Sequence, residues 1–363
     1  MEKSKKGPVL RWCAAFSIPL LLTALYLFFS RSKALADKAV RYFSRPVRDA
    51  LGTLNALIPF SVMELIYAAA VIFILIYIIL TVVRTVRSPK KAGTLLRRVL
   101  VLVLIVLYVA SLYLAMWGID YKSSSFSDKT GVSAGAVTTE DLYAVTKHFV
   151  LNAFLKAGNV KRDSGHFAED YRDYFLRVDT LYDALSEEFP VLACSSRTPK
   201  AMIFSRIMSY MGFTGIYFPF TGESNLNVDA PAAFIPFTVA HELAHQRGVY
   251  AEQEANFLGV AACLSSGDPV YEYSGYLAGS LYLMNALYKA DHDLWAELYA
   301  SISGAYGTDW DDNNAYWRAF ESPVTTASEK VYDTYLKANG QDLGIRSYGA
   351  CVDMLVNYYK DKV

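Results

Sequence analysis

Three long apolar runs dominate the first third of this 363-residue chain. They span residues 12–29, 62–83 and 99–117, with Trp or Tyr near several of their ends. Each run is close to the ~20 residues that cross a ~30 Å hydrocarbon core as a helix, and interfacial aromatic residues are typical of such spans. The pattern predicts a membrane domain over residues 1–121 with three transmembrane helices, so we expect the lipid bilayer to be one partner.

The first run has an alternative interpretation. It follows a basic stretch that includes Lys6 and Arg11, and Ala34-Leu35-Ala36 is typical of a cleavage site. This is the layout of a secretory signal peptide. Because the run is long for the apolar core of a signal peptide, we favour a retained anchor over a cleaved segment.

The distribution of lysine and arginine around the runs predicts an orientation. The N-terminus and residues 84–98 are basic, and the segment just after Trp117 is nearly uncharged. The loop after the first run is also basic, but acids offset it, and residues 36–57 within it suit an amphipathic helix in the interface. Since basic loops stay on the cytoplasmic side, we expect a multi-pass protein of the cell membrane. Its N-terminus would be cytoplasmic and its C-terminal domain extracytoplasmic.

Beyond the third run the pattern becomes that of a mainly α fold. Residues 122–137 are polar and rich in Ser and Gly, which predicts a linker before a domain over residues 138–363. Apolar positions at helical spacing predict several helices there. They include residues 138–157, 166–189 and 200–211. Residues 215–227 read GIYFPFTGESNLN and predict short strands or an edge strand.

The candidate chemistry lies in the next predicted helix, which reads His241-Glu242-Leu243-Ala244-His245. Two histidines four residues apart lie on one face of a helix, so both imidazoles can reach one metal ion. Glu242 can point into the cleft beside that ion and handle a proton. The arrangement suits Zn²⁺, which lowers the pKa of a bound water to about 7. We therefore predict His241 and His245 as metal ligands and Glu242 as the general base.

A third ligand is expected on the helix that follows. Gly248 can end the first helix in the left-handed conformation, and a second helix can begin near Ala251. Glu252 and Glu254 lie about 200° apart around that helix, so only one of them can face the histidines. We choose Glu252 as the third ligand. Asn256 lies one turn further on, where it would orient one of the histidines by a hydrogen bond without contacting the metal itself.

This spacing resembles that of the gluzincin metallopeptidases, in which a Glu-x-x-x-Asp pattern follows His-Glu-x-x-His. Here Asn256 stands where aspartate is usual, and the connection between the two parts is short. Over nearly the whole chain, further segments resemble one bacterial membrane family known as domain of unknown function 3810, which is described as zincin-like. They read WGIDY, YFPFTGESNLN, HELAHQRGVYAEQEANF, YSGYLAGSLYLMNALY and VYDTYLKANGQDLGIRSY. The resemblance implies a helical zincin-like domain and places residues 332–348 near its site, with Lys337, Asn339, Gln341 and Tyr348 as candidates.

Substrate-binding residues are predicted from the same resemblance. In zincins an edge strand beside the cleft pairs with substrate backbone. Phe218 and Phe220 could form subsite walls, and Asn225 or Asn227 could bond the substrate, although a structural turn would explain residues 215–227 equally well. For the oxyanion, the candidates are Tyr250, Tyr348 and Arg247. The other histidines, His148, His166 and His292, are expected to be ordinary surface or core residues.

Composition restricts the partners but not the substrate. The formal net charge is +0, so nothing indicates nucleic acid. One disulfide among Cys194, Cys263 and Cys351 is possible outside the cytoplasm. The sequence therefore predicts a membrane-anchored zinc metallopeptidase acting on a peptide or protein, of open oligomeric state. The alternative is a non-catalytic membrane protein whose zinc stabilises a binding or assembly domain.

Overall fold

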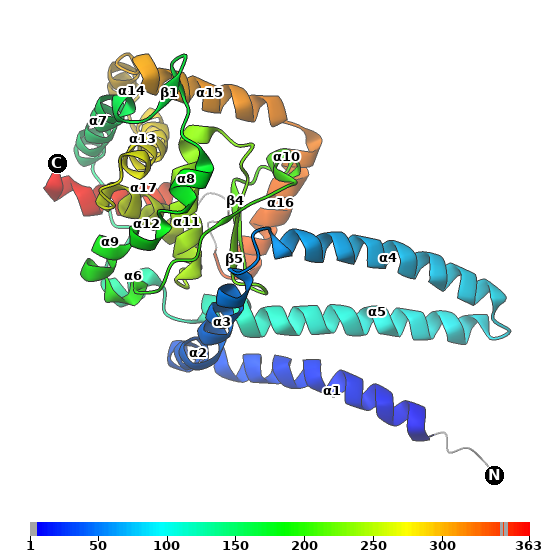
Figure 1. The fold of residues 1–363 in the computed structure, drawn as a ribbon. Helices are drawn as coiled ribbons and strands as arrows, with labels where there is room; N and C mark the ends of the chain where they lie inside the picture. Colours follow the sequence, from blue (N-terminus) through cyan, green and yellow to red (C-terminus); the bar gives the residue numbers. More distant parts are fainter. Residues whose placement is uncertain (1–5, 342–343, 345–347) are drawn as a thin grey trace, which may run out of the picture. The chain divides into compact units, whose positions relative to one another are not determined.

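The computed structural model describes residues 6–341, 344 and 348–363, and the chain forms two compact units (Figure 1). The first comprises Met1–Leu51, Val62–Ser124 and Pro219–Thr221. The second comprises Gly52–Ser61, Ser125–Phe218 and Gly222–Val363. The main division therefore falls inside the linker expected over residues 122–137, and a short piece of the N-terminal region belongs to the second unit.

Three apolar helices make up most of the first unit. They are α1 (Lys6–Phe29), α4 (Val62–Arg87) and α5 (Lys91–Tyr113), and a π-helical turn, η2 (Leu114–Gly118), continues the last of them. Within the described residues, Leu10–Phe29, Val62–Arg87 and Lys91–Gly118 are long and apolar enough to cross a membrane. The expected set of three candidate spans is thus confirmed, with longer second and third helices than the apolar runs alone indicated.

A helical stretch joins the first two apolar helices, as expected for residues 36–57. It consists of α2 (Lys33–Ala39), a π-helical turn η1 (Val40–Ser44) and α3 (Arg45–Asn55). Arg48 projects from α3 into the first unit and is only 2% exposed. Its guanidinium forms a two-pronged ion pair with Asp120, at 2.6 and 2.8 Å, and lies 4.8 Å from the ring centre of Trp117. This buried pair fastens the helical stretch to the end of the third apolar segment.

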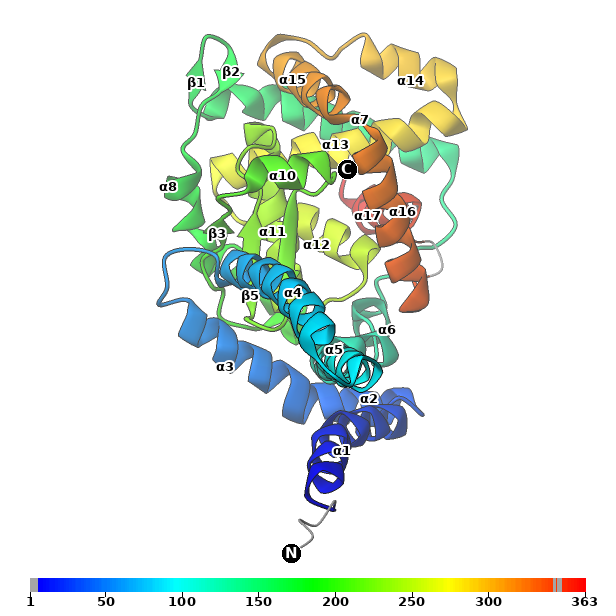
Figure 2. The same cartoon turned by 90° about the vertical axis from the view of Figure 1, so that its right-hand side faces the viewer.

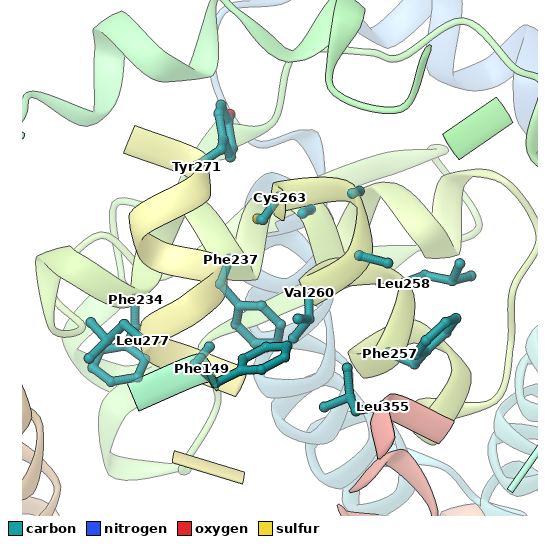
Figure 3. Close-up of a cluster of buried hydrophobic side chains, with 14 of the residues drawn as sticks. Phe149, Phe234, Phe237, Phe257, Leu258, Val260, Cys263, Tyr271, Leu277 and Leu355 are labelled. Carbon is teal, nitrogen blue, oxygen red and sulfur yellow. The ribbon is translucent and has the colours of Figure 1, made fainter. Parts of the chain in front are cut away.

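The second unit is built around helices that share one hydrophobic core (Figure 3). Phe149 from α7, Phe237 from α11 and Val260 from α12 meet at its centre. The core helices are α7 (Thr139–Lys156), α11 (Ile235–Gln246), α12 (Glu252–Ser265), α13 (Pro269–Ala290) and α17 (Tyr348–Tyr359). The outer helices are α6 (Phe126–Thr130), α8 (Tyr171–Phe175), α9 (Asp183–Glu188), α10 (Ser205–Tyr210), α14 (His292–Tyr299), α15 (Gly304–Phe320) and α16 (Pro323–Ala338).

A small sheet lies beside α11. Its strands are β3 (Lys200–Ala201), β4 (Gly215–Phe218) and β5 (Glu223–Leu226), in the order β3-β5-β4. β4 runs antiparallel to β5 and β3 parallel to it, so β4 is an edge strand, as expected for residues 215–227. A second pair, β1 (Arg162–Asp163) and β2 (His166–Phe167), forms a separate hairpin.

Several expectations for the second unit are wrong. The helix expected over residues 166–189 is divided among β2, α8, α9 and short turns, and residues 200–211 form β3 followed by α10. In the first case aromatic side chains such as Tyr174 and Tyr182 are buried at the core, and the chain bends to place them there. The expected linker over residues 122–137 contains α6, whose Phe126 is 3% exposed and belongs to the core.

Candidate metal centre

Local sequence explains how the candidate ligands come together. α11 begins at Ile235 with Pro236 in its first turn, where the missing N–H costs no hydrogen bond. The helix ends at Gln246, and Gly248 adopts φ +85°, a left-handed conformation that favours glycine. The chain then turns and α12 starts at Glu252. The first turn of α12 is thereby brought back to the face of α11 that carries the histidines.

His241, His245 and Glu252 form a compact donor cluster. The Nε2 atoms of the two histidines lie 3.2 Å apart. The Glu252 carboxylate lies 3.4 Å from Nε2 of His241 and 3.7 Å from Nε2 of His245. Zinc bonds of ~2.0–2.1 Å in tetrahedral geometry would place such ligand atoms ~3.3 Å from one another. The donor types and their separations therefore fit a zinc ion held by these three residues.

Hydrogen bonds from neighbouring groups orient two of these candidate ligands. Nδ1 of His245 donates to the carbonyl of Val249 at 2.6 Å, which leaves the Nε2 lone pair directed at the cluster. The hydroxyl of Tyr332 donates to Oε1 of Glu252 at 2.7 Å. Gln341 accepts from the backbone N–H of Glu252 at 3.1 Å. The start of α12 and its carboxylate are thus held in place from the C-terminal part of the chain.

Tyr332 contacts the cluster but was not among the residues that we predicted from the sequence. It lies at the start of residues 332–348, which the family resemblance placed near the site, and that was its only signal. Of the candidates in that stretch, Gln341 does reach the site. Lys337 pairs with Asp333 on its own helix, and the Asn339 amide donates to a carbonyl of the same helix.

The structure resolves the choice between Glu252 and Glu254. Glu254 is 2% exposed, and its carboxylate accepts hydrogen bonds from the backbone N–H groups of Phe126 and Ser127 at 3.0 and 2.9 Å. It therefore caps α6 on a different side of α12. Glu252 is the carboxylate that meets the histidines, as expected.

Asn256 takes the supporting position expected of it. It lies on α12 one turn beyond Glu252, and its side chain interacts with the His241 imidazole and favours the charged form of that ring. Its amide oxygen also accepts a hydrogen bond from Tyr282 at 3.3 Å. Nδ1 of His241 is buried and has no hydrogen-bond partner of ordinary geometry in the described part of the chain.

Glu242 is buried beside the cluster and is not one of the clustered ligands. It is 3% exposed, and its carboxylate lies against Gly215 of β4. A Cβ added to Gly215 would stand 2.6 Å from Oε1 of Glu242, so only glycine leaves room for the carboxylate there. The backbone of Tyr217 donates a hydrogen bond to this carboxylate. Oε2 of Glu242 is buried without a hydrogen-bond partner among the described residues.

Burial and neighbouring charges set the protonation of these groups in different directions. Burial raises the pKa of Glu242 to about 8. Burial also lowers the pKa of His245 to about 4. Desolvation opposes ionisation of Glu252, but the two histidines and Tyr332 outweigh it and lower the pKa of Glu252 to about 2. Burial likewise lowers the pKa of His241, and the hydrogen bond and charge of Glu252 more than reverse this. The pKa values of the two neighbouring carboxyl groups, Glu242 and Glu252, are thus shifted in opposite directions.

The asparagines expected to bind substrate are structural instead. Asn225 is completely buried, and its amide oxygen accepts from Ser61 at 2.6 Å. Asn227 is also completely buried and donates to Ser209 and to the carbonyl of Phe213, both at 2.9 Å. Both side chains face inward, where hydrogen bonds with Ser61, Ser209 and Phe213 satisfy them. That prediction was wrong for this reason.

The aromatic substrate candidates are placed less directly. Phe218 is 8% exposed and ends β4. Phe220 lies in the connection between β4 and β5, within the short segment that groups with the first unit. Tyr250 precedes α12, and its carbonyl accepts from Gln341 at 3.3 Å. Tyr348 begins α17, but its side chain lies outside the described residues.

Arg247 is excluded as an oxyanion donor because it is used internally. It is 4% exposed, donates to Ser196 at 2.8 Å and to the carbonyl of Leu243 at 3.1 Å, and packs on the ring of Tyr182.

The remaining histidines make other contacts, as expected. His148 bonds Asn152, His166 pairs with Asp312, and His292 packs on Trp295. Cys13, Cys194, Cys263 and Cys351 are all free thiols, so the possible disulfide is not formed.

Taken together, the fold and the site define a mainly helical protein with three helices capable of crossing a membrane and a buried His-His-Glu cluster that could hold a metal ion. The sequence matches the family described as "Protein of unknown function (DUF3810)" over residues 40–356, and the chain belongs to that family. No curated protein and no solved structure matches it.

Proposed function

We propose that the protein is a membrane-anchored zinc metallopeptidase that hydrolyses peptide bonds in a peptide or protein substrate. The observation that carries the proposal is the position of Glu242. Its carboxylate is buried next to His241, His245 and Glu252 but does not belong to that cluster of candidate zinc ligands. A purely structural zinc site is closed by a fourth protein ligand and has no use for a proton acceptor. When bound, zinc would activate a water molecule and polarise the scissile carbonyl.

The residues of the chain would divide the work as follows. His241, His245 and Glu252 hold the metal, and Tyr332 keeps the carboxylate of Glu252 in position. Glu242 takes the proton of the attacking water on Oε2, the atom without a hydrogen-bond partner in the described structure, and passes it to the leaving amine. A raised pKa suits both roles, since it lets one carboxyl group accept and then release a proton near neutral pH.

Strand β4 offers a place for the substrate backbone. Thr214 and Phe218 accept hydrogen bonds from Asn227 and Gly222, so the alternation of an antiparallel pair turns Gly215 and Tyr217 away from β5. The Tyr217 backbone already bonds Glu242 on this open side. An extended peptide that paired with this edge would lie alongside the general base.

The test uses the full-length protein in detergent micelles or nanodiscs. Wild type, Glu242→Gln and His245→Ala are compared for metal content and for turnover of a quenched peptide library. We expect about one zinc per chain and turnover in the wild type, zinc without turnover in Glu242→Gln, and neither in His245→Ala. Zinc in the wild type without turnover of any peptide would instead favour a binding or assembly domain stabilised by the metal. Absence of zinc would refute the proposal.

A further inference from the structure

An apolar face on the second unit goes beyond the proposed catalytic role. It is defined by exposed side chains from two segments, which are Leu57, Phe60, Ile203, Phe204, Ile207 and Met211. Leu57 is 83% exposed, Ile203 76% and Ile207 56%. Single exposed apolar residues are common on proteins, but a group of this size marks a surface that contacts something apolar.

The two segments of the apolar face are held together by hydrogen bonds within the second unit. Nζ of Lys200 donates to the carbonyl of Asn55 at 2.7 Å. Leu57 lies two residues beyond Asn55, and Ile203 lies three residues beyond Lys200. Each residue extends a chain by at most ~3.6 Å, so both apolar side chains start close to this bond. The two segments of the apolar face therefore start from neighbouring points of the second unit.

Its helical part presents apolar residues at regular spacing. Ile203, Ile207 and Met211 recur every four residues through the turn before α10, the helix itself and the turn after it. Arg206 is also exposed there, with 69% of its side chain accessible. Aliphatic and aromatic side chains flanked by a basic residue are the composition of segments that lie in a membrane interface.

Chain connectivity identifies what this face meets. Ser61 is anchored to the sheet by a 2.6 Å hydrogen bond to Asn225, and the next residue, Val62, begins the apolar helix α4. If α4 crosses a membrane, the point where the chain leaves the bilayer lies one residue from this anchor. Leu57 and Phe60 immediately precede it. This part of the apolar face would then lie close to the level of the lipid headgroups.

From these observations we infer that the second unit docks its apolar face on the surface of the bilayer in which the chain is anchored. Covalent attachment makes the docking intramolecular, so a modest apolar surface is sufficient. Arg206 lies 3.8 Å from Asp229 and over the ring of Phe320, so it would stay at the polar border of the face, while Ile203 and Ile207 enter the acyl boundary. Docking depends on the apolar helices crossing a membrane and is independent of catalysis. The partner is lipid and not a second protein.

Site-directed spin labels on the full-length protein in nanodiscs of phosphatidylcholine and phosphatidylglycerol test this inference. Cys13 and Cys194 are replaced by serine, whereas Cys263 and Cys351 are completely buried and should not react with the label. Labels are introduced by Ile203→Cys, Ile207→Cys and, as a matched control, Leu155→Cys. Leu155 is 60% exposed and lies on α7, in another part of the same unit (Figure 1).

Power saturation then compares the accessibility of each label to oxygen, which concentrates in lipid, and to a water-soluble nickel chelate. We expect the oxygen-to-nickel ratio to be several-fold higher at the Ile203→Cys and Ile207→Cys labels than at the Leu155→Cys label. Equal ratios at all three positions would overturn the inference, because the face would then be in water. Low accessibility to both reagents would also overturn it, since protein would then cover the face. Because all three positions are exposed, labelling should not disturb folding, and an unchanged melting temperature verifies this.

Figure 2 shows α10 and α16 on the same side of the second unit. The hydroxyl of Thr325 on α16 donates to the carbonyl of Tyr210 on α10 at 3.1 Å, which couples the two helices. β4 follows α10 after a few residues, so a bilayer contact at α10 would place the open strand edge of the candidate site near the membrane surface. Substrates segregated to that surface would then reach it most readily.

Discussion

Replacing Gly215 by alanine is expected to disable Glu242 and leave the metal cluster intact. The added Cβ would stand 2.6 Å from Oε1 of Glu242, 2.9 Å from its Cγ and 3.0 Å from its Cδ. Separations below 3.0 Å are not tolerated, and the backbone of β4 is held by its pairing with β5. The carboxylate must therefore move away from Gly215 and from the backbone of Tyr217.

Two magnitudes follow from this displacement. Loss of a hydrogen bond by a buried carboxylate costs about 1–3 kcal/mol of folding free energy, which lowers the melting temperature by ~2–4 °C for each kcal/mol in a unit of this size. A general base misplaced by ~1 Å loses about 10²-fold in turnover. Metal content should not change, because His241, His245 and Glu252 are not among the atoms nearest to the added Cβ.

Metal content, kcat and KM of Gly215→Ala are compared with the wild type and with Gly158→Ala. Gly158 is a suitable control because a Cβ there meets nothing within 4 Å. We expect Gly215→Ala to lose about a hundredfold in kcat with full zinc occupancy, and Gly158→Ala to lose nothing. Wild-type turnover in Gly215→Ala would refute the assigned position of Glu242. Loss of zinc together with turnover would show that the strand supports the metal cluster instead.

Three further predictions concern the metal support and the membrane unit. Glu252→Gln should lose zinc, whereas Glu254→Gln should keep it and lower the melting temperature, which metal analysis and thermal unfolding can distinguish. Tyr332→Phe should weaken zinc binding by ~10–100-fold, as for other groups that orient a ligand, and competition with a chelator of known affinity would measure it. Asp120→Ala should destabilise the first unit by about 3–5 kcal/mol, because it leaves Arg48 buried without its counter-ion. Arg48→Met combined with Asp120→Ala should recover part of that loss, and equal stability of the single and double variants would contradict the buried-pair argument.

The candidate ligands could be predicted because helical geometry is local. Residues four apart on a helix share a face whatever surrounds them, so His241 and His245 follow from spacing alone. Gly248 indicates the end of the helix by the same local logic. The structure places Glu252 and not Glu254 beside the histidines, as we expected, but the reason is not local. The carboxylate of Glu254 accepts hydrogen bonds from the backbone N–H groups of Phe126 and Ser127, so it does not face the histidines.

The predictions that failed share a different cause. Asn225 and Asn227 have the chemistry of substrate-binding residues, yet both form hydrogen bonds inside the second unit. The guanidinium of Arg247 also forms internal hydrogen bonds. A polar side chain looks alike in sequence whether it faces a cleft or the interior. Which of the two holds depends on partners far away along the chain, such as Ser61 for Asn225.

The amino-acid sequence was sufficient to predict the apolar helices, the pair of histidines with its adjacent glutamate, and the short strands before them. Each of these predictions rests on composition or on periodicity within a few residues. Neither composition nor periodicity depends on contacts with distant parts of the chain. The folded structure was needed to find that Tyr332 and Gln341 hold Glu252, that Gly215 makes room for Glu242, and that apolar side chains are exposed at α10. These features arise where segments tens of residues to more than a hundred residues apart meet. Their energies come from burial and directed hydrogen bonds, which the order of residues along the chain does not display.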